Sequence, residues 1–519
     1  MNVDLSDLNP PDLQAALSWA ETEFATLDCG DTRRTRRFVR VASDFIRNPS
    51  AAIPTACRDW SGTKACYRLF DQPEVNSGAI LAAHRAAMLE RLRTGDEGAT
   101  LLVLQDTTSL NYDNHRSKEG LGPTAGHGKD RSPGLFVHGQ LVAGTDGAVH
   151  GLASAHVYAR QPRGAGEPAG QRNRQPLEEK ESHRWVGGWH EAQRLWEDLG
   201  GTRPVLSVAD READIYELLA ACQQARTERG GGAGLLVRSQ HERKLEDAGT
   251  PLWQTPGALP VTAALAVGLP RGKQGLKARQ ATLAVRAGRV RLAVPAHKKK
   301  YLGLSESLEL WALEVREIDP PPGVEPVCWQ LLTTEPVADA GDAARLVGWY
   351  ALRWRIEDFH RVLKTGCRVE SRQVRAAEKL QAFIALDMVV AVHLLSLVWQ
   401  ARISPASPVH GWLERDEWEV LAVHAAGGGP PPMPSAASVA GLLAGSRRLV
   451  VAEDVVDHAN LGAIARSAAA ASDEPPPSPA PGTTTRTRST TRDRCTCAWG
   501  ATNGRSYSTT ATSSSSARA

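Results

Sequence analysis

Two short apolar runs, each ending in an aspartate, constrain the fold of this chain more than any other feature. Residues 100–106 read TLLVLQD and residues 204–210 read PVLSVAD. Apolar runs of this length that stop at a turn-favouring residue predict buried β-strands. Three further strand candidates (LFVHGQLVAG, VHGLASAHVY and GLLVRSQ) and a helix at READIYELLAACQQA accompany them, and a connection of about 45 residues leaves room for another helix. This order predicts an α/β fold with a mixed sheet and helices on its faces.

Other segments flank or interrupt the α/β pattern. Apolar residues at helical spacing predict mostly helix over 10–95, over 342–400 and over 411–467. Residues 245–335 alternate like strands and are punctuated by glycine and proline, which predicts a β-rich insertion. Because apolar periodicity ends near residue 468, we expect 468–519 to be a disordered low-complexity tail.

The charge of the chain gives little indication of its partner. The formal net charge is only +3, so any DNA-binding surface must come from local clusters of Lys and Arg. One cluster lies along a single predicted helical segment and consists of Arg33, Arg34, Arg36, Arg37 and Arg40. These arginines form either a solvated helix face or a phosphate-contacting surface, and the run alone does not decide between the two.

Cysteine usage and apolar segments indicate the compartment. The eight cysteines are scattered and none forms a CxxC pair, which predicts free thiols in a reducing cytoplasm. The N-terminus is acidic and lacks an apolar core, so we expect no signal peptide. Residues 380–400 are nearly long and apolar enough to span a bilayer, but Asp387 and His393 would be costly in lipid. We therefore expect a buried core helix and no membrane partner.

The two aspartates are the first candidates for chemistry. Asp106 and Asp210 each stand at the carboxyl end of a predicted strand. If these strands are neighbours, both carboxylates emerge at the same edge of the sheet, the usual ligand-binding side. The alternative is that aspartate follows strands simply because it favours turns. Either residue alone fits the second explanation better.

A third candidate lies in the string YALRWRIEDFHRVLK. Tyr350, Arg353, Glu357 and Lys364 are spaced by 3, 4 and 7 residues, so on one helix they fall within a wedge of roughly 60°, and Arg361 falls with them. A glutamate flanked by cations suits a site that binds both metal and phosphate. A solvated face with Glu–Arg and Glu–Lys pairs has the same pattern, so geometry alone leaves both interpretations open.

These residues resemble a known family. The spacing YxxRxxxExxxxxxK is similar to the YREK signature of the bacterial DDE transposases of the insertion-sequence-four family. LQDTTSLNY around Asp106 and VADREADIYELL around Asp210 look like the first and second carboxylate motifs of that family. VRSQH, WQLLTTEPV and the N-terminal LDCGDTRRTRR and GTKACYRLF also match in kind and order. The resemblance covers roughly residues 15–400.

The resemblance implies a fold and a domain organisation. The expected fold is an RNase H-like mixed-sheet catalytic domain with a β-rich insertion, flanked by helical N- and C-terminal domains. The expected domains are a helical DNA-end-binding domain at 1–80, the catalytic domain at 81–400 with the insertion at about 245–335, a helical dimerisation region at 401–467 and the tail at 468–519.

It also implies roles for individual residues. Asp106, Asp210 and Glu357 would bind two Mg²⁺ ions, for which Mn²⁺ would substitute. The expected contacts to transposon-end phosphates are Tyr350, Arg353, Arg361, Lys364 and Arg238. Trp329 would stack on a flipped base, with a core strand aromatic as the alternative. Arg33, Arg34, Arg36 and Arg37 would read the terminal inverted repeat.

The implied reaction is cut-and-paste transposition by a homodimer. Water nicks one strand, the freed 3′-hydroxyl closes a hairpin on the opposite strand, water reopens it, and the 3′-hydroxyl attacks target DNA. The resemblance ends after about residue 462, where the change of composition resembles a shifted reading frame. Two alternatives therefore stay open: an RNase H-like nuclease without strand transfer, and an end-binding remnant with impaired dimerisation.

Overall fold

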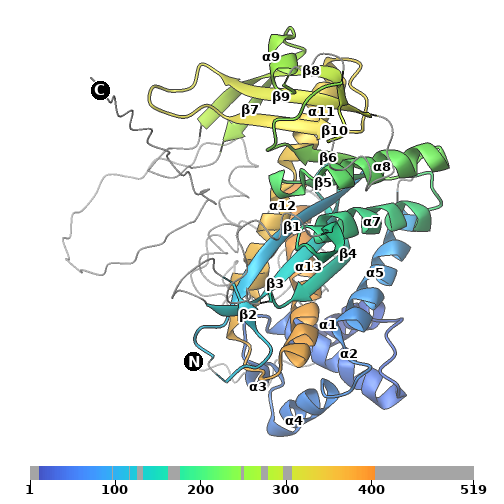
Figure 1. Cartoon of the computed structure of the whole chain (residues 1–519). Coiled ribbons are helices and arrows are strands. Elements are labelled where there is room, and N and C mark those ends of the chain that lie inside the picture. The colour runs from blue at the N-terminus through green and yellow to red at the C-terminus, as the bar shows by residue number, and fades with distance from the viewer. Residues whose placement is uncertain are drawn as a thin grey trace, which may run out of the picture.

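The structure is a computed structural model that describes residues 11–95, 98–115, 117–124, 132–161, 176–246, 251–269, 279–295 and 307–403. Nearly all of the predicted dimerisation region, and the whole of the predicted tail, lie outside these described residues. The described part is a mixed α/β structure built on one large sheet. The helices of the N-terminal region are grouped at one end of this structure (Figure 1).

The N-terminal region is helical, as its apolar spacing predicted. Its helices are α1 (Pro11–Glu23), α2 (Thr32–Arg47), α3 (Ile53–Ala56), α4 (Trp60–Leu69) and α5 (Ser77–Arg93). Capping residues set the starts of three of them, because the side chains of Asp31, Asp59 and Asn76 accept hydrogen bonds from the first turns of α2, α4 and α5. The aromatic side of α2 is buried, while most of its arginines are exposed.

The sheet mixes parallel and antiparallel pairs. Its first strands are β1 (Leu101–Asn111), β2 (Gly122–Pro123), β3 (Pro133–Gly144), β4 (Val149–Tyr158), β5 (Val205–Ala209) and β6 (Gly234–Arg238). β1, β5 and β6 lie side by side in parallel, whereas β3 pairs antiparallel with both β1 and β4. The predicted strands next to the two aspartates are therefore direct neighbours, as the sequence prediction required.

The β-rich segment continues the same sheet. Its strands β7 (Ala263–Leu269), β8 (Arg279–Leu292), β9 (Leu308–Ile318) and β10 (Cys328–Thr333) extend the strand order as β6-β10-β9-β8-β7. β10 is hydrogen-bonded antiparallel to β6, so these strands do not form a separate layer (Figure 1). A short helix, α9 (Gln254–Ala258), packs on β8 and β9.

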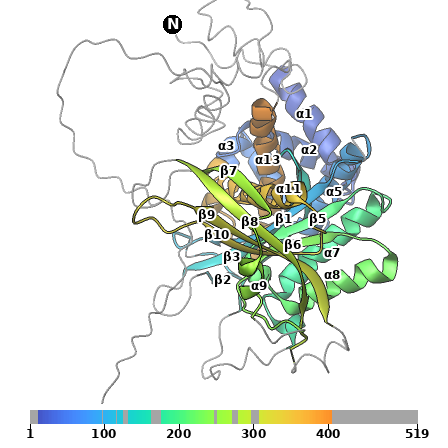
Figure 2. The same ribbon diagram turned by 90° about the horizontal axis from the view of Figure 1, so that it is seen from above.

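Helices cover both faces of the sheet. Alternate side chains of β1 point to opposite faces: Leu102 and Leu104 join the apolar cluster of α12 (Trp354–Arg361) and α13 (Ala377–Ile403). Leu101 and Val103 join the cluster of α5 and α7 (His183–Asp198). Seen from above, α7 and α8 (Tyr216–Arg229) lie on one side of the strands and α13 on the other (Figure 2).

The single helix expected to carry Tyr350 to Lys364 is broken. α11 (Ala340–Ala351) ends before Arg353, and α12 begins at Trp354. At the joint the amide of Arg353 bonds to the carbonyl of Tyr350, three residues back, which tightens the turn. After α12 a π-helical turn covers Val362–Gly366 and a 3₁₀ turn covers Val369–Ser371. The four signature side chains and Arg361 therefore do not share one regular helix.

α13 is a core helix. Within the described residues, its segment Ala377–Trp399 is the one stretch of helix long and apolar enough to cross a membrane, with a mean hydropathy of 2.1. However, 67% of that window is buried inside the structure. α13 packs against α5 and β4, and its Asp387 is buried in an ion pair with Arg372. These contacts are those of a helix that organises a protein core.

Candidate active site

Asp106 and Asp210 stand at the same level of two adjacent parallel strands. The β1–β5 ladder runs from Leu101–Val205 to Leu104–Val208, and each aspartate comes two residues after that last pair. The prediction that both strands end at their aspartates is correct for β5 and wrong for β1. β1 continues to Asn111 because β3 pairs with it along its full length and satisfies its backbone.

Each aspartate uses one carboxylate oxygen to hold its own local backbone. Asp106 Oδ1 accepts a hydrogen bond of 2.8 Å from the amide of Thr107. Asp210 Oδ1 accepts one of 2.8 Å from the amide of Glu212 and thereby caps the 3₁₀ turn Arg211–Ala213. The turn-forming role is therefore real for Asp210, and it fixes the orientation of that carboxylate.

Arg353 joins Asp106 to Glu357. Its Nη2 donates to Glu357 Oε1 at 2.7 Å, and its Nη1 lies 3.6 Å from Asp106 Oδ2. The side chain of Arg353 is 9% exposed, that of Asp106 is 20% exposed and that of Glu357 is 40% exposed, so the site opens to solvent on the glutamate side. The structure thus brings α12 to the edge where β1 passes the end of β5.

The site carries more negative charge than its cations balance. The pKa of Asp106 is raised to about 7, first by burial and then by the neighbouring charges of Asp210 and Glu357, against the opposing charge of Arg353. His360 Nδ1 lies 4.0 Å from Asp106 Oδ2, but burial lowers the pKa of His360 to about 3 and leaves the ring neutral. The charges of Lys364 and Arg353 act in the same direction.

These residues fit a divalent cation in chemistry. Carboxylate oxygens are the ligands that hard ions prefer, and a bound cation would favour the ionised form of Asp106, which burial disfavours here by raising its pKa. Within the described residues, no group of three or more His, Cys, Asp or Glu is already gathered at metal-binding geometry. Asp106 interacts electrostatically with both Asp210 and Glu357, and Arg353 contacts Asp106 and Glu357.

Three of the predicted DNA contacts, Tyr350, Trp329 and Arg238, lie close together near Asp210. The Tyr350 ring is buried and packs edge-on against Trp329, with ring centroids 5.3 Å apart. Trp329 is half-buried on β10, so it packs against the core and still reaches solvent. Arg238 Nη2 donates to the carbonyl of Cys328, next to Trp329, at 3.1 Å.

The two remaining cations predicted on this helix face, Lys364 and Arg361, differ from each other. Lys364 is partly buried, and desolvation lowers the pKa of its ammonium. Arg361 was expected on the same wedge as Glu357, but it is directed to Asp358, with which it forms an ion pair. Asp358 is also held by Arg355 at 2.8 Å. A contact of Arg361 with DNA stays a prediction.

The N-terminal arginines present a charged face. Arg33, Arg36, Arg37 and Arg40 are exposed on α2, on the side away from the buried rings of Phe38 and Phe45. Arg34 is 41% exposed and lies 3.7 Å from Glu74. The six described cysteines (Cys29, Cys57, Cys66, Cys222, Cys328 and Cys367) are free thiols, as predicted.

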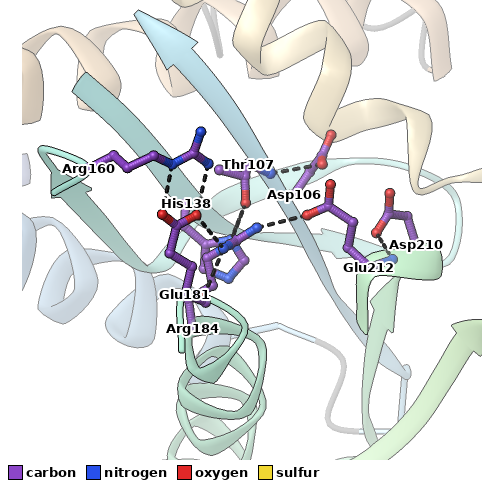
Figure 3. A network of polar contacts seen from close by, with 8 residues as sticks. All are labelled: Asp106, Thr107, His138, Arg160, Glu181, Arg184, Asp210 and Glu212. Carbon is purple, nitrogen blue, oxygen red and sulfur yellow. Dashed lines mark hydrogen bonds and ion pairs between the residues drawn. The ribbon is translucent and has the colours of Figure 1, made fainter. Parts of the chain in front are cut away.

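Sequence reasoning missed a polar network behind the two aspartates. Figure 3 shows Arg184 of α7 between Thr107 and Glu212, with His138 of β3 below Thr107. Nothing in the spacing of these residues marks them, because the sheet and the packing of α7 on it bring them together. The motif strings LQDTT and ADRE contain Thr107 and Glu212 but give no sign of a shared partner.

Comparison with family models assigns two parts of the chain. Residues 16–75 match a model described as transposase DNA-binding, which covers the arginine-bearing α2. Residues 169–392 match a model described as transposase DDE domain. The second match contains Asp210 and Glu357, whereas Asp106 precedes it.

Proposed function

The chain is a DDE transposase, an enzyme that cleaves DNA and transfers its strands, and we propose that it is a cut-and-paste transposase of the insertion-sequence-four family. In this proposal Asp106, Asp210 and Glu357 are the catalytic carboxylates. The observation that carries it is their placement. Two aspartates occupy equal levels of neighbouring parallel strands, and Arg353 ties the glutamate to the first of them.

DDE transposase domains use divalent metal ions, and we propose Mg²⁺ as the physiological ion, with Mn²⁺ as a substitute. When bound, two such ions supply activation of the attacking oxygen and stabilisation of the leaving oxygen. Asp106, Asp210 and Glu357 would hold them. Arg353 pairs with Asp106 and Glu357 in this structure, and its guanidinium would turn to a DNA phosphate once the carboxylates bind cations.

The surrounding residues position DNA in this proposal. Lys364 and Tyr350 lie next to the carboxylate site and would contact the phosphates of the transposon end, with Arg238 as a further contact and Arg361 at the exposed rim. The accessible part of Trp329 would stack on a base that leaves the helix during hairpin formation. The exposed face of Arg33, Arg36 and Arg37, with the partly exposed Arg34, would bind the inverted repeats of double-stranded DNA.

We further propose that two chains act together as a homodimer, in the bacterial cytoplasm and on the nucleoid. The free thiols suit a reducing compartment. Residues 401–467 are the proposed dimer contact.

A reconstituted reaction with the DNA that flanks the gene tests this proposal. With Mg²⁺, we expect a nick at each end, then a hairpin visible on a denaturing gel, then joining of pre-cleaved ends to a target plasmid. Cleavage without joining would instead support the nuclease alternative. Binding of the ends with neither step, together with a monomer in gel filtration, would support the end-binding remnant.

A further inference from the structure

Among the described residues, the backbone ladder that joins β1 to β5 stops before it reaches the level of Asp106 and Asp210. The parallel ladder between β1 and β5 ends at Leu104–Val208, two residues before both aspartates. Beyond that pair β1 continues along β3, while the chain after β5 enters the 3₁₀ turn Arg211–Ala213. The ladder therefore does not fix the separation of the two carboxylates.

Arg184 bridges these two segments with its side chain. Its Nε donates to Thr107 Oγ1 at 3.0 Å, and its Nη2 pairs with Glu212 Oε2 at 2.7 Å (Figure 3). Thr107 directly follows Asp106, and Glu212 comes two residues after Asp210. One guanidinium thus connects the residues beside both aspartates, at the level where backbone pairing has stopped.

The bridge reaches the carboxylates themselves. The amide of Thr107 donates to Asp106 Oδ1 at 2.8 Å, and the amide of Glu212 donates to Asp210 Oδ1 at 2.8 Å. A shift of Thr107 or Glu212 therefore moves the donor that orients the adjacent aspartate. The path from the Asp106 carboxylate to the Asp210 carboxylate therefore runs through the amide and hydroxyl of Thr107, the guanidinium of Arg184, and the carboxylate and amide of Glu212. Each step is a hydrogen bond, an ion pair or a covalent link within one residue.

Arg184 is itself held in place. Its side chain is 13% exposed, its Nη1 donates to the carbonyl of Glu181 at 2.8 Å, and its guanidinium lies 5.6 Å from the centroid of the Trp185 ring. His138, which is buried, fixes the Thr107 hydroxyl at 2.9 Å. A planar guanidinium held in this way makes two directed contacts at once, which a lysine ammonium on a flexible stem does not reproduce.

We propose that Arg184 is a positioning residue that sets the separation of Asp106 and Asp210 and so the affinity of this site for divalent cations. This inference rests on the proposed function, in which the two aspartates bind metal. Residues that orient metal ligands typically change metal affinity by about 10–100-fold when they are replaced.

The test is a Mn²⁺ titration of the full-length protein with its end DNA, followed by water-proton relaxation. Arg184→Gln is expected to weaken Mn²⁺ binding by about 10–100-fold. Arg184→Lys should have the same effect, because a lysine keeps the positive charge but lacks the planar guanidinium that contacts Thr107 and Glu212 at once. The matched control is Arg194→Gln on the same helix, where an arginine 69% exposed pairs with Glu191 at 3.0 Å. The control should bind Mn²⁺ like the unmodified protein.

Glu212→Gln removes the ion pair with Arg184 at the more exposed side chain of the two. It is the variant to measure if Arg184→Gln does not fold. It should weaken Mn²⁺ binding in the same direction. A purely structural role would lower the melting temperature but leave the Mn²⁺ affinity of the folded protein unchanged, and that result in both variants would overturn the inference. Asp210→Asn distinguishes a failure of the inference about Arg184 from a failure of the proposed function. Unchanged Mn²⁺ binding in this variant would contradict the proposed function itself.

Discussion

Two sites in this molecule pair a buried arginine with acidic side chains, and they differ in how completely the charges are matched. Arg372 makes two bonds to Asp387, of 2.8 and 2.6 Å, and both side chains are 1% exposed. Its other N–H groups donate to the carbonyls of Ala51 and Pro49 at 2.6 and 3.1 Å. One cation meets one anion, and the pair ties α13 to the N-terminal region.

Arg353 has the opposite balance. It contacts two carboxylates, Glu357 at 2.7 Å and Asp106 at 3.6 Å, and the charge of Asp210 also acts on Asp106. Within the described part of the chain, its Nε is buried and has no hydrogen-bond partner. The first site is complete as it stands, whereas the second has negative charge left for a ligand. Similar residue types therefore give a structural pair in one place and a candidate active site in the other.

The largest expected effect comes from the incomplete site. Glu357→Gln keeps the size of the side chain and removes a carboxylate that the proposal gives to metal. We expect the rate of transposon-end cleavage to fall by about 10³-fold or more, because loss of one member of a catalytic unit costs nearly as much activity as loss of the whole unit. End binding in a gel-shift assay should remain near normal. Cleavage at a normal rate would remove Glu357 from the site.

Breaking the complete pair should affect stability instead. Asp387→Asn leaves the buried Arg372 without its counter-ion, and the free energy of unfolding should fall by about 3–5 kcal/mol, measured by urea unfolding. The matched control is Asp106→Asn, which removes one of the two carboxylates that share the single guanidinium of Arg353. It should leave the unfolding free energy unchanged or raise it. Equal losses in the two variants would show that the sites do not differ.

A second complete cluster predicts a pH dependence. Burial alone would raise the pKa of Glu23, but the hydrogen bonds and charges of His84 and Arg91 outweigh it and hold that pKa at about 2. The folded pKa is below the unfolded value, so this stabilisation is present above about pH 4.5 and is lost as pH falls toward 2.

Glu23→Gln should therefore cost about 3 kcal/mol of unfolding free energy at neutral pH, and the deficit should shrink below pH 4.5. Unfolding curves at a series of pH values measure it. Glu90→Gln, which removes a surface partner 3.7 Å from Arg93, is the control and should change stability by less than about 0.5 kcal/mol. A deficit that does not vary with pH would contradict the assigned pairing.

The smallest expected effect is on DNA binding by α2. Arg33→Ala removes one exposed cation, so end-DNA affinity should fall modestly and the slope of log affinity against log salt should decrease by about 1. Filter binding at several salt concentrations gives the slope. An unchanged slope would place Arg33 outside the DNA interface.

Much of the fold was predictable because apolar patterns are local. The runs before Asp106 and Asp210 predicted buried strands, and the structure shows that these strands are neighbours that pair in parallel. The extension of β1 to Asn111 was not predictable, since the polar residues TTSLN give no strand signal without their partner β3. The break before Trp354 was also hidden, because YALRWRIED contains neither glycine nor proline.

The site itself was predictable only in part. Chemistry and spacing single out Asp106, Asp210 and Glu357, but the bridge through Arg184 depends on how α7 packs onto the sheet. The ion pair between Arg353 and the carboxylates was likewise not apparent, because residues 106 and 353 are far apart in sequence. Such contacts are properties of the tertiary structure.

Anomalous diffraction from crystals of the protein bound to its end DNA and soaked in Mn²⁺ would test the central assignment most directly. We expect two manganese peaks, each within ligand distance of carboxylate oxygens from Asp106, Asp210 and Glu357, with Arg353 moved to a phosphate. Manganese bound at other residues, with these three carboxylates unligated, would contradict the assignment.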